Sequence, residues 1–310
     1  MRLISILVPA YNEEESIPKL YKDIDDSLKK MNDIEWELWF VNDGSSDSTE
    51  KAILDLIDKD SRVHIISFRR NFGKSPALQA GFRHVNGDII FTMDADLQDD
   101  PAEIPNFIKK IDEGYDLVVG WKKKRLDPIE KRLPSKLFNA VTSMAAGFKL
   151  HDFDCGFKCF RREVVDALDV YGELHRYIPV LAYRNGFKIT EITVNHRERK
   201  HGRSKYGAER YMRGLLDSFT TTFLLRFSDR PMYFFGRIGV IFSIIGFLIC
   251  MGLSIEWIMG IAIGHRPLLL LGVLLIIVGF QSVSIGFVCN LIIDQNVRKN
   301  YNENHIKLIK

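Results

Sequence analysis

Residues 91–100, FTMDADLQDD, place four aspartates directly after an apolar run. Asp94 and Asp96 stand two positions apart, and carboxylates at that spacing can turn toward one point where the chain bends after a strand. Their mutual repulsion lowers stability unless a cation lies between them. Carboxylate oxygens suit Mg²⁺ or Mn²⁺ that also holds substrate phosphates, and Gln98 offers a further neutral oxygen. The stretch therefore predicts a divalent metal site at Asp94, Asp96 and Gln98.

Three other apolar runs also end in polar segments. These segments are PAYNEEE (9–15), NDGSSD (42–47) and RRNFGKS (69–75). In open sheets of parallel strands, ligands bind beyond the carboxyl ends of the strands. We therefore expect all four segments to meet at one ligand site.

Two common nucleotide-binding motifs are excluded. The G-K-S at 73–75 lacks the upstream glycine of a phosphate loop, because position 68 holds Phe68. No G-x-G-x-x-G occurs anywhere in the chain. The sequence therefore supports neither a P-loop NTPase nor a dinucleotide-binding dehydrogenase.

The elements that position these segments alternate between strands and helices. Helix starts are predicted at Ser16, Asp47, Ser75 and Asp100. Apolar runs of strand length predict strands at 3–9, 36–42, 63–68, 88–93 and 116–121. Alternation with short links predicts an α/β fold, a Rossmann-like and mostly parallel sheet with helices on both faces.

Composition limits the classes of function. The 310 residues carry a formal net charge of +3, so no nucleic-acid partner is expected. Four cysteines form no C-x-x-C pair, which is typical of a reducing compartment. The first residues, MRLISILVPAYNEEE, lack the small-residue cleavage site of a signal peptide.

Two uncharged apolar runs, residues 238–255 and 268–293, mark the C-terminal region. Their lengths predict membrane spans at about 234–259 and 267–294, as a two-helix hairpin within 232–296. Basic residues flank the outer ends of both runs, so the positive-inside rule places both termini in the cytosol. We therefore expect a multi-pass protein of the cell (inner) membrane with a cytosolic tail at 297–310.

The segment 208–231 connects the globular part to the hairpin. Apolar residues recur there at helical spacing with arginines between them. This pattern favours an amphipathic helix that lies on membrane lipid. A core helix of the globular domain is the alternative.

Several segments together resemble glycosyltransferase family 2. They are VPAYNEEESI, VNDGSSDST, RRNFGKSPALQAGF, GDIIFTMDADLQDDP, DFDCGFKCFRREV and HRERKHGRSKYG. Within the family, the chain is most similar to the polyprenyl-phosphate glycosyltransferases, the group of dolichyl-phosphate mannose synthase and bacterial undecaprenyl-phosphate sugar transferases. The resemblance runs from residue 3 to about 213, and it implies a GT-A domain over residues 1–207.

The resemblance also implies a role for individual residues. Nucleotide-sugar binding falls to Pro9, Tyr11, Glu13, Asp43, Lys74, Asp94, Ala95 and Asp96. Catalytic roles fall to Asp94, Asp96 and Asp152, with Asp154 as a rival acid on the acceptor side. Binding of the acceptor or of the diphosphate falls to Arg125, Arg132, Arg199, Ser204, Lys205 and Tyr206. The other basic residues of 121–132 are expected to be solvated.

The implied reaction is a metal-dependent, inverting transfer of sugar from a nucleotide-sugar to a polyprenyl phosphate. UDP is expected over GDP, with UDP-glucose as an example, and Mg²⁺ and Mn²⁺ stay open as the cofactor. Tetramers occur in the family, so a homo-oligomer is one expected state. Two alternatives remain: a processive polysaccharide synthase, although its Q-x-x-R-W motif is missing, and a non-catalytic nucleotide-sugar-binding scaffold.

Overall fold

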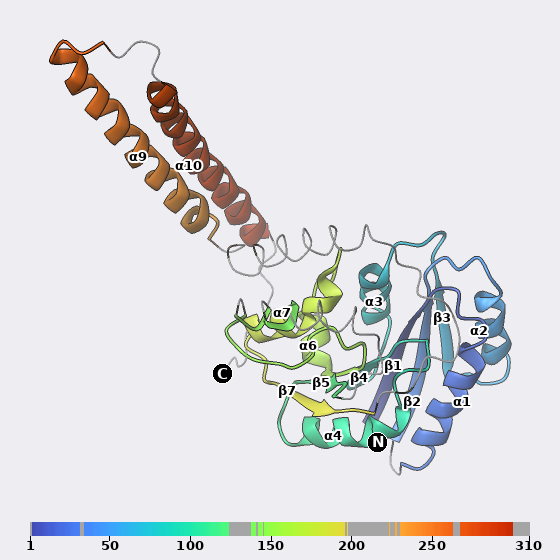
Figure 1. Ribbon diagram of the computed structural model, residues 1–310. Helices are drawn as coiled ribbons and strands as arrows, with labels where there is room; N and C mark the ends of the chain where they lie inside the picture. The colour runs from blue at the N-terminus through green and yellow to red at the C-terminus, as the bar shows by residue number, and fades with distance from the viewer. Residues whose placement is uncertain are drawn as a thin grey trace. The chain divides into compact units, whose positions relative to one another are not determined.

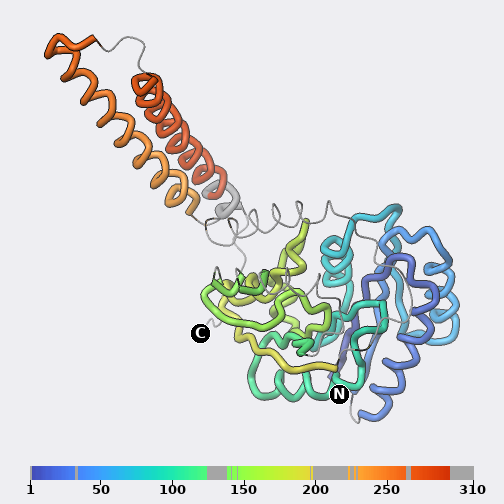
Figure 2. The backbone as a smooth tube through the Cα atoms, in the orientation of Figure 1, coloured from blue at the N-terminus to red at the C-terminus, as the bar shows by residue number. Residues whose placement is uncertain are grey.

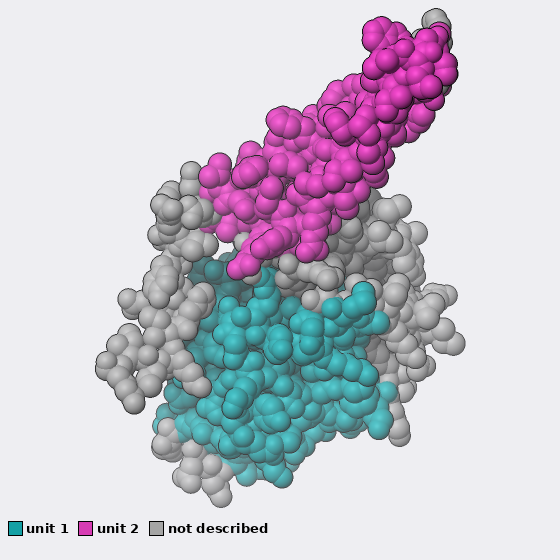
Figure 3. Space-filling model, turned by 90° about the vertical axis from the view of Figure 1, so that its left-hand side faces the viewer, with its two compact units in different colours: residues 1–221, 304–310 teal, residues 222–303 magenta. Residues whose placement is uncertain are grey.

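The computed structural model describes most of the chain. The described residues are 2–31, 34–123, 138–140, 142–144, 146–195, 197, 223, 227, 230–262 and 267–299, with side chains to 293. Figure 2 draws the other residues in grey. The chain divides into two compact units, Met1–Thr221 with Asn304–Lys310 and Thr222–Glu303 (Figure 3).

A seven-stranded sheet forms the centre of the N-terminal unit (Figure 1). Its strands are β1 Arg2–Ala10, β2 Ile34–Asn42, β3 Val63–Ser67, β4 Ile89–Thr92, β5 Leu117–Trp121, β6 Lys158–Arg161 and β7 Ile189–Thr193. Their order in the sheet is β3-β2-β1-β4-β6-β5-β7. Strand β6 runs antiparallel to β4 and β5, and the other pairs are parallel. The predicted α/β fold with a mostly parallel sheet is confirmed.

Helices pack against both faces of this sheet. Figure 1 shows α3 on one side of the sheet and α4 on the other. The helices of this unit are α1 Ile17–Leu28, α2 Thr49–Ile57, α3 Lys74–Phe82, η1 Pro101–Glu103, α4 Ile104–Asp112, α6 Arg162–Asp166, η2 Leu174–Tyr177 and α7 Ile178–Arg184. Strands β1 and β4 are covered on both faces, which explains why their sequences are apolar almost throughout.

An aromatic cluster lies in the core below the end of β4. The ring of Phe107 in α4 lies 4.4 Å from that of Phe157 and 5.8 Å from that of Phe91 in β4. All three side chains are fully buried. Their packing makes the core next to β4 rigid, and the aspartate-rich segment follows directly after this strand.

The helix starts agree with the sequence in part. Asp100 caps η1 as predicted, with its Oδ1 accepting the Ala102 N–H at 3.1 Å. Ser16 holds the N-cap position of α1, but its hydroxyl donates to Glu13 instead of capping. Asp47 caps α2 as predicted, because its Oδ1 accepts the Thr49 N–H at 3.0 Å, whereas the helix start predicted at Ser75 is one residue late. Helix α2 starts after Ser48, and α3 starts at Lys74, with Gly73 as its N-cap.

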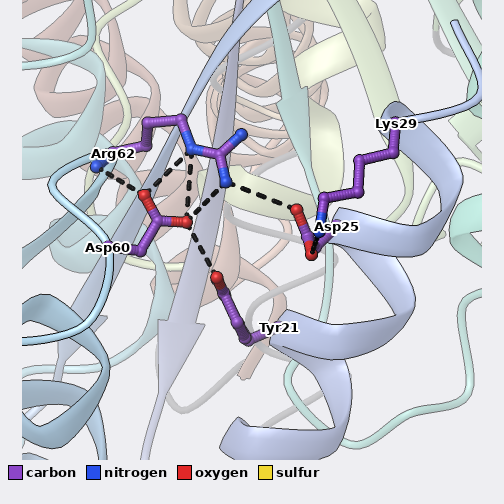
Figure 4. A network of polar contacts seen from close by, with 5 residues as sticks. All are labelled: Tyr21, Asp25, Lys29, Asp60 and Arg62. Atoms are coloured by element: carbon purple, nitrogen blue, oxygen red, sulfur yellow. Dashed lines mark hydrogen bonds and ion pairs between the residues drawn. The ribbon is translucent and has the colours of Figure 1, made fainter.

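A polar network ties α1 to the loop before β3 (Figure 4). Arg62 donates to both oxygens of Asp60, at 2.7 Å from Nη2 and 2.9 Å from Nε, and also approaches Asp25 at 3.4 Å. The Tyr21 hydroxyl donates to Asp60 at 2.8 Å. The Arg62 hydrogen bonds hold the pKa of the Asp60 carboxyl well below its usual range despite partial burial.

The C-terminal unit contains two long apolar helices, α9 Met232–Ile258 and α10 Pro267–Lys299. Met232–Ile258 and Pro267–Ile293 are long and apolar enough to cross a membrane, with mean hydropathies of 2.6 and 2.5. The two helices pack closely at small residues: a Cβ on Gly239 would lie 2.6 Å from the Gly279 carbonyl oxygen. The pair therefore forms a helical hairpin.

Candidate active site

Lys74 and Asp94 form the centre of the candidate site. Asp94 follows β4, and its carboxylate forms an ion pair with the ammonium of Lys74 in the first turn of α3. Burial raises the pKa of the Asp94 carboxyl, but Lys74, Lys122 and Lys158 lower it more, so that it lies well below the usual range. Gly156 allows the facing loop to approach, because a Cβ there would lie 2.4 Å from Asp94 Oδ2. Asp94 is therefore an ionised carboxylate in a strongly cationic setting.

The segment after Asp94 turns sharply. Asp96 is buried, and its Oδ1 accepts the Gln98 N–H at 3.1 Å. Between them, Leu97 has a φ of +64°, a left-handed conformation that is rare for a leucine. Such backbone strain is typical of functional sites. The turn holds the Asp96 carboxylate against the backbone of Gln98, and the metal site at Asp94, Asp96 and Gln98 stays a prediction.

Two further lysines belong to this site, and sequence reasoning missed both. Lys122, expected to be solvated, is only 11% exposed and lies 2.8 Å from the carboxylate of Asp99. That expectation is wrong, because the residue after β5 faces the buried acid after β4. Lys158 of β6 is buried and donates to the Cys155 carbonyl, and burial lowers the pKa of its ammonium. The mixed basic and apolar sequence around each lysine carried no signal of this burial.

Asp43 holds the loop between β3 and α3. Its two carboxylate oxygens accept the N–H groups of Phe72 at 2.7 Å and Gly73 at 2.9 Å. Burial raises the pKa of Asp43, and these two hydrogen bonds oppose the rise. Asp43 thereby fixes the residues directly before Lys74. Its contact with a nucleotide base stays a prediction.

The loop after β1 interlocks with the loop after β2. Asn12 Oδ1 accepts the Ser46 N–H at 2.8 Å, and the Glu13 N–H donates to Thr49 Oγ1 at 2.8 Å. Tyr11 is 39% exposed, Pro9 is half-buried at the end of β1, and Ala95 is buried after β4. Strands β1 to β4 are parallel, so all these loops follow the same edge of the sheet.

The two acids of the segment 151–158 differ in environment. Asp152 is buried, with 1% of its surface exposed. Its negative charge acts on the nearby groups of Cys155 and Lys158. Asp154 is exposed, and its Oδ1 lies 3.8 Å from Arg176 Nε. The structure therefore buries Asp152 and exposes Asp154, and the charge of each acts on Lys158.

The predicted acceptor residues lie outside the described residues. They are Arg125, Arg132, Arg199, Ser204, Lys205 and Tyr206. Arg197, in the same basic stretch, is described, and sequence reasoning missed it. Its N–H donates to the Gln98 carbonyl at 3.1 Å, and its guanidinium contacts Asp100 at 2.7 Å and also Asp23. Arg197 therefore stabilises the conformation of the aspartate-rich segment through its contacts with Gln98 and Asp100.

Comparison with known proteins shows the family of this chain. Residues 5–169 match the sequence pattern described as glycosyl transferase family 2. The chain belongs to this family. This glycosyltransferase is 34% identical over 309 residues to dodecaprenyl-phosphate galacturonate synthase of Rhizobium johnstonii, covering 98% of this chain and 91% of that one. It is 37% identical over 288 residues to the undecaprenyl-phosphate 4-deoxy-4-formamido-L-arabinose transferase of Shewanella sediminis, covering 91% and 85%.

Solved structures share the GT-A fold of this glycosyltransferase. Glucosyl-3-phosphoglycerate synthase of Mycobacterium tuberculosis, solved with Mn²⁺ and UDP-glucose, superposes with a TM-score of 0.53 at 20% identity, covering 71% of this chain and 79% of that chain. The mannosyltransferase PcManGT of Pyrobaculum calidifontis, solved with GDP-Man and Mn²⁺, gives 0.52 at 20% identity, covering 70% and 63%. At these identities the likeness concerns the fold alone.

The donor set of this glycosyltransferase fits a divalent cation. No group of three or more His, Cys, Asp or Glu side chains suited to a metal occurs among the residues that the structure describes. Mg²⁺ and Mn²⁺ sites beside phosphates commonly use only one or two carboxylates, with phosphate oxygens as further ligands. Asp94 and Asp96 supply two such carboxylates, and the Lys74 ammonium on Asp94 shows that this carboxylate accepts a cationic partner.

Proposed function

We propose that this glycosyltransferase transfers a sugar from a nucleotide-sugar, UDP-linked, to a polyprenyl phosphate at the cytosolic membrane face. The products are a polyprenyl-phosphate-sugar and a nucleoside diphosphate. The observation that carries the proposal is the cationic cluster around Asp94 at the ends of parallel strands. The activities in the names of the curated relatives support the lipid-phosphate acceptor. Their alignments cover more than nine-tenths of this chain.

Lys74 and Lys122 help the nucleoside diphosphate to leave. Lys74 and Lys122 are cationic, and the pKa of each ammonium is raised, because nearby carboxylates outweigh the effect of burial. A diphosphate beside Lys74 gains electrostatic stabilisation as negative charge develops on it. A divalent cation held by Asp94, Asp96 and Gln98 would supply further stabilisation of that charge. Asp43 contributes by fixing the loop that carries Lys74.

The acceptor needs little activation. A phosphate monoester is already mostly ionised at neutral pH, because its second pKa is about 6. A strong general base is therefore less necessary than for a hydroxyl acceptor. Buried Asp152 has the role of orienting the sugar or the neighbouring cations, and attack of the phosphate oxygen on C1 inverts the anomeric centre.

Membrane attachment brings the enzyme to a lipid substrate. Helices α9 and α10 carry exposed apolar side chains along most of their length, including Phe247, Leu270 and Phe280. A water-exposed surface of this kind is unfavourable, whereas lipid covers it at no such cost. We propose a hairpin that spans the inner membrane with both termini in the cytosol. The membrane-lying helix expected at 208–231 falls almost entirely outside the described residues. The tetramer stays a prediction.

The sugar is the open part of the proposal. The names of the curated relatives specify galacturonate and 4-deoxy-4-formamido-L-arabinose, so glucose has no support among them. The solved relatives include complexes with UDP-glucose and with GDP-Man. A donor panel must therefore contain uronic acid, modified pentose and hexose donors on both nucleotides.

The test uses the full chain in lipid nanodiscs with Mn²⁺ or Mg²⁺, undecaprenyl phosphate and each labelled donor in turn. We expect one donor to yield a labelled glycolipid together with an equal amount of free nucleoside diphosphate. Absence of labelled lipid with every donor would overturn the proposal. Loss of the sugar to water, without a lipid product, would likewise contradict the lipid acceptor.

A further inference from the structure

His175 contacts the first turn of α3, one residue from Lys74. It lies in η2, far along the chain from α3. The Ser75 hydroxyl lies 2.9 Å from His175 Nδ1, and it also accepts the His175 backbone N–H at 3.1 Å. Ser75 is fully buried, so this double contact fixes the orientation of the imidazole ring.

The hydrogen bonds also define the tautomer of His175. A serine hydroxyl has one proton to donate. Within the described part of the chain, Ser75 Oγ has His175 as its only hydrogen-bond partner. Its proton therefore goes to Nδ1, which acts as an acceptor. The neutral imidazole then carries its own proton on Nε2.

The Nε2 atom is available to a ligand. The His175 residue is half-buried, and its buried edge is the one that meets Ser75. Among the described residues, no hydrogen-bond partner of Nε2 exists, and the atom does not belong to the buried unsatisfied polar atoms. An N–H donor with a fixed ring orientation is therefore partly exposed near Lys74.

The charges around His175 are mostly positive. Burial lowers the pKa of His175 most, Lys74, Arg176 and Lys158 lower it as well, Asp154 opposes them, and the pKa falls to about 3. The imidazole therefore stays neutral at all working pH values. A neutral donor surrounded by three cations is suited to an anionic acceptor group.

We propose that His175 Nε2–H donates a hydrogen bond to a substrate phosphate oxygen, on either the donor diphosphate or the acceptor monophosphate. The assignment rests on the proposed function, since both phosphates belong to that reaction. A phosphate fits better than a sugar hydroxyl, because Lys74 and Lys158 attract negative charge to this place. His175 then selects the position of the phosphate without adding a charge of its own.

Two substitutions separate this role from a structural one. The amide of His175→Asn can reach the position of Nδ1, so it keeps the contact with Ser75 but loses the Nε2 donor. The amide of His175→Gln reaches the position of Nε2, so it keeps that donor but loses Nδ1. His84→Asn is the matched control, because His84 is exposed and its ring, among the described residues, has the Ala80 carbonyl as its one hydrogen-bond partner. Thermal unfolding checks that all three variants fold.

The measurements are the calorimetric Kd of UDP, with the metal present, and the KM and kcat for undecaprenyl phosphate. For His175→Asn we expect a loss of about tenfold or more in binding or in kcat/KM, the range for one hydrogen bond to a charged group. His175→Gln should retain most activity, and His84→Asn all of it. A raised Kd of UDP assigns the contact to the diphosphate. A raised KM for the lipid, with the Kd of UDP unchanged, assigns it to the acceptor.

The inference is overturned if His175→Asn keeps both constants within about twofold of the wild type, or if His175→Gln loses as much as His175→Asn. A wild type that binds UDP but forms no glycolipid would instead defeat the proposed function. In that case the Kd of UDP is the remaining test of the hydrogen bond from His175 to the phosphate. An unchanged Kd in His175→Asn then rejects this hydrogen bond.

Discussion

The ammonium of Lys74 in α3 forms an ion pair with the carboxylate of Asp94 after β4. The predicted metal ligand therefore already has a cationic partner within the protein. Both side chains are about one-third exposed, so the pair can exchange with ligands from solvent. A divalent cation on Asp94 and a diphosphate on Lys74 would replace the ion pair together, which couples the two binding events.

Substitution of Lys74 tests this coupling. Lys74→Met removes the competing ammonium, so its affinity for Mn²⁺ in the absence of nucleotide should rise about five- to tenfold, as expected for losing an ion pair worth about 1 kcal/mol. Turnover should fall, because the diphosphate loses a cation. Calorimetry with Mn²⁺ measures the affinity directly. Added UDP should raise the Mn²⁺ affinity of the wild type more than that of the variant.

Two controls accompany Lys74→Met. Lys74→Arg retains the ion pair and should bind Mn²⁺ as the wild type does, and Lys59→Met removes an exposed lysine of the loop after α2. An unchanged or weaker Mn²⁺ affinity in Lys74→Met would show that Lys74 does not compete with the metal.

Burial separates Asp152 from Asp154 as the acceptor-side acid. Asp152 is buried, whereas Asp154 is exposed near Arg176, and the charges of both act on Lys158. We expect Asp152→Asn to lower kcat about tenfold or more, because the lost charge leaves a buried lysine less compensated. Asp154→Asn should change kcat less than about threefold, as is usual for an exposed ion pair. Retained UDP binding would show that Asp152→Asn is folded, and the reverse order of effects would assign the role to Asp154.

The sequence was sufficient to predict the strands that carry the site. Strands β1, β4 and β5 are nearly continuous apolar runs because both faces of this part of the sheet are covered, and such runs are visible without a structure. The polar segments after β1 to β4 follow one edge of the sheet, since parallel strands bring their carboxyl ends to the same edge.

The antiparallel strand and the lysine cluster could not be predicted. Strand β6 has only four residues, KCFR, with a charge at each end, and it inserts between β4 and β5 from far along the chain. The burial of Lys122 and Lys158 depends on that insertion and on Asp99 and Asp152 nearby. His175 was missed because a lone histidine in a sequence gives no sign that a buried Ser75 orients it.

The network around Asp60 predicts a pH-dependent contribution to stability. The pKa of Asp60 is depressed in the folded state, so its stabilisation is present above the unfolded pKa of about 3.9 and is lost as the pH falls through the folded pKa. Asp60→Asn should lower the free energy of unfolding by about 2 kcal/mol at pH 7, since Asp60 is mostly buried and bonded to Arg62 and Tyr21.

Chemical unfolding of the full chain in detergent, followed by tryptophan fluorescence, measures this difference. The gap between wild type and Asp60→Asn should narrow below about pH 4. Asp112→Asn, which removes a surface partner of Arg2, should stay close to the wild type throughout. A gap that is constant from pH 7 to pH 3 would refute the assignment to the Asp60 charge.

The role of Asp96 is tested most directly by the rate of glycolipid formation. This rate is measured for the full chain with its preferred donor, in the wild type and in Asp96→Asn. Asp96→Asn should lower this rate on the order of 10²-fold or more, because the leaving diphosphate loses its electrostatic support. Asp112→Asn should leave it unchanged. Glycolipid formation by Asp96→Asn at the wild-type rate would contradict the account.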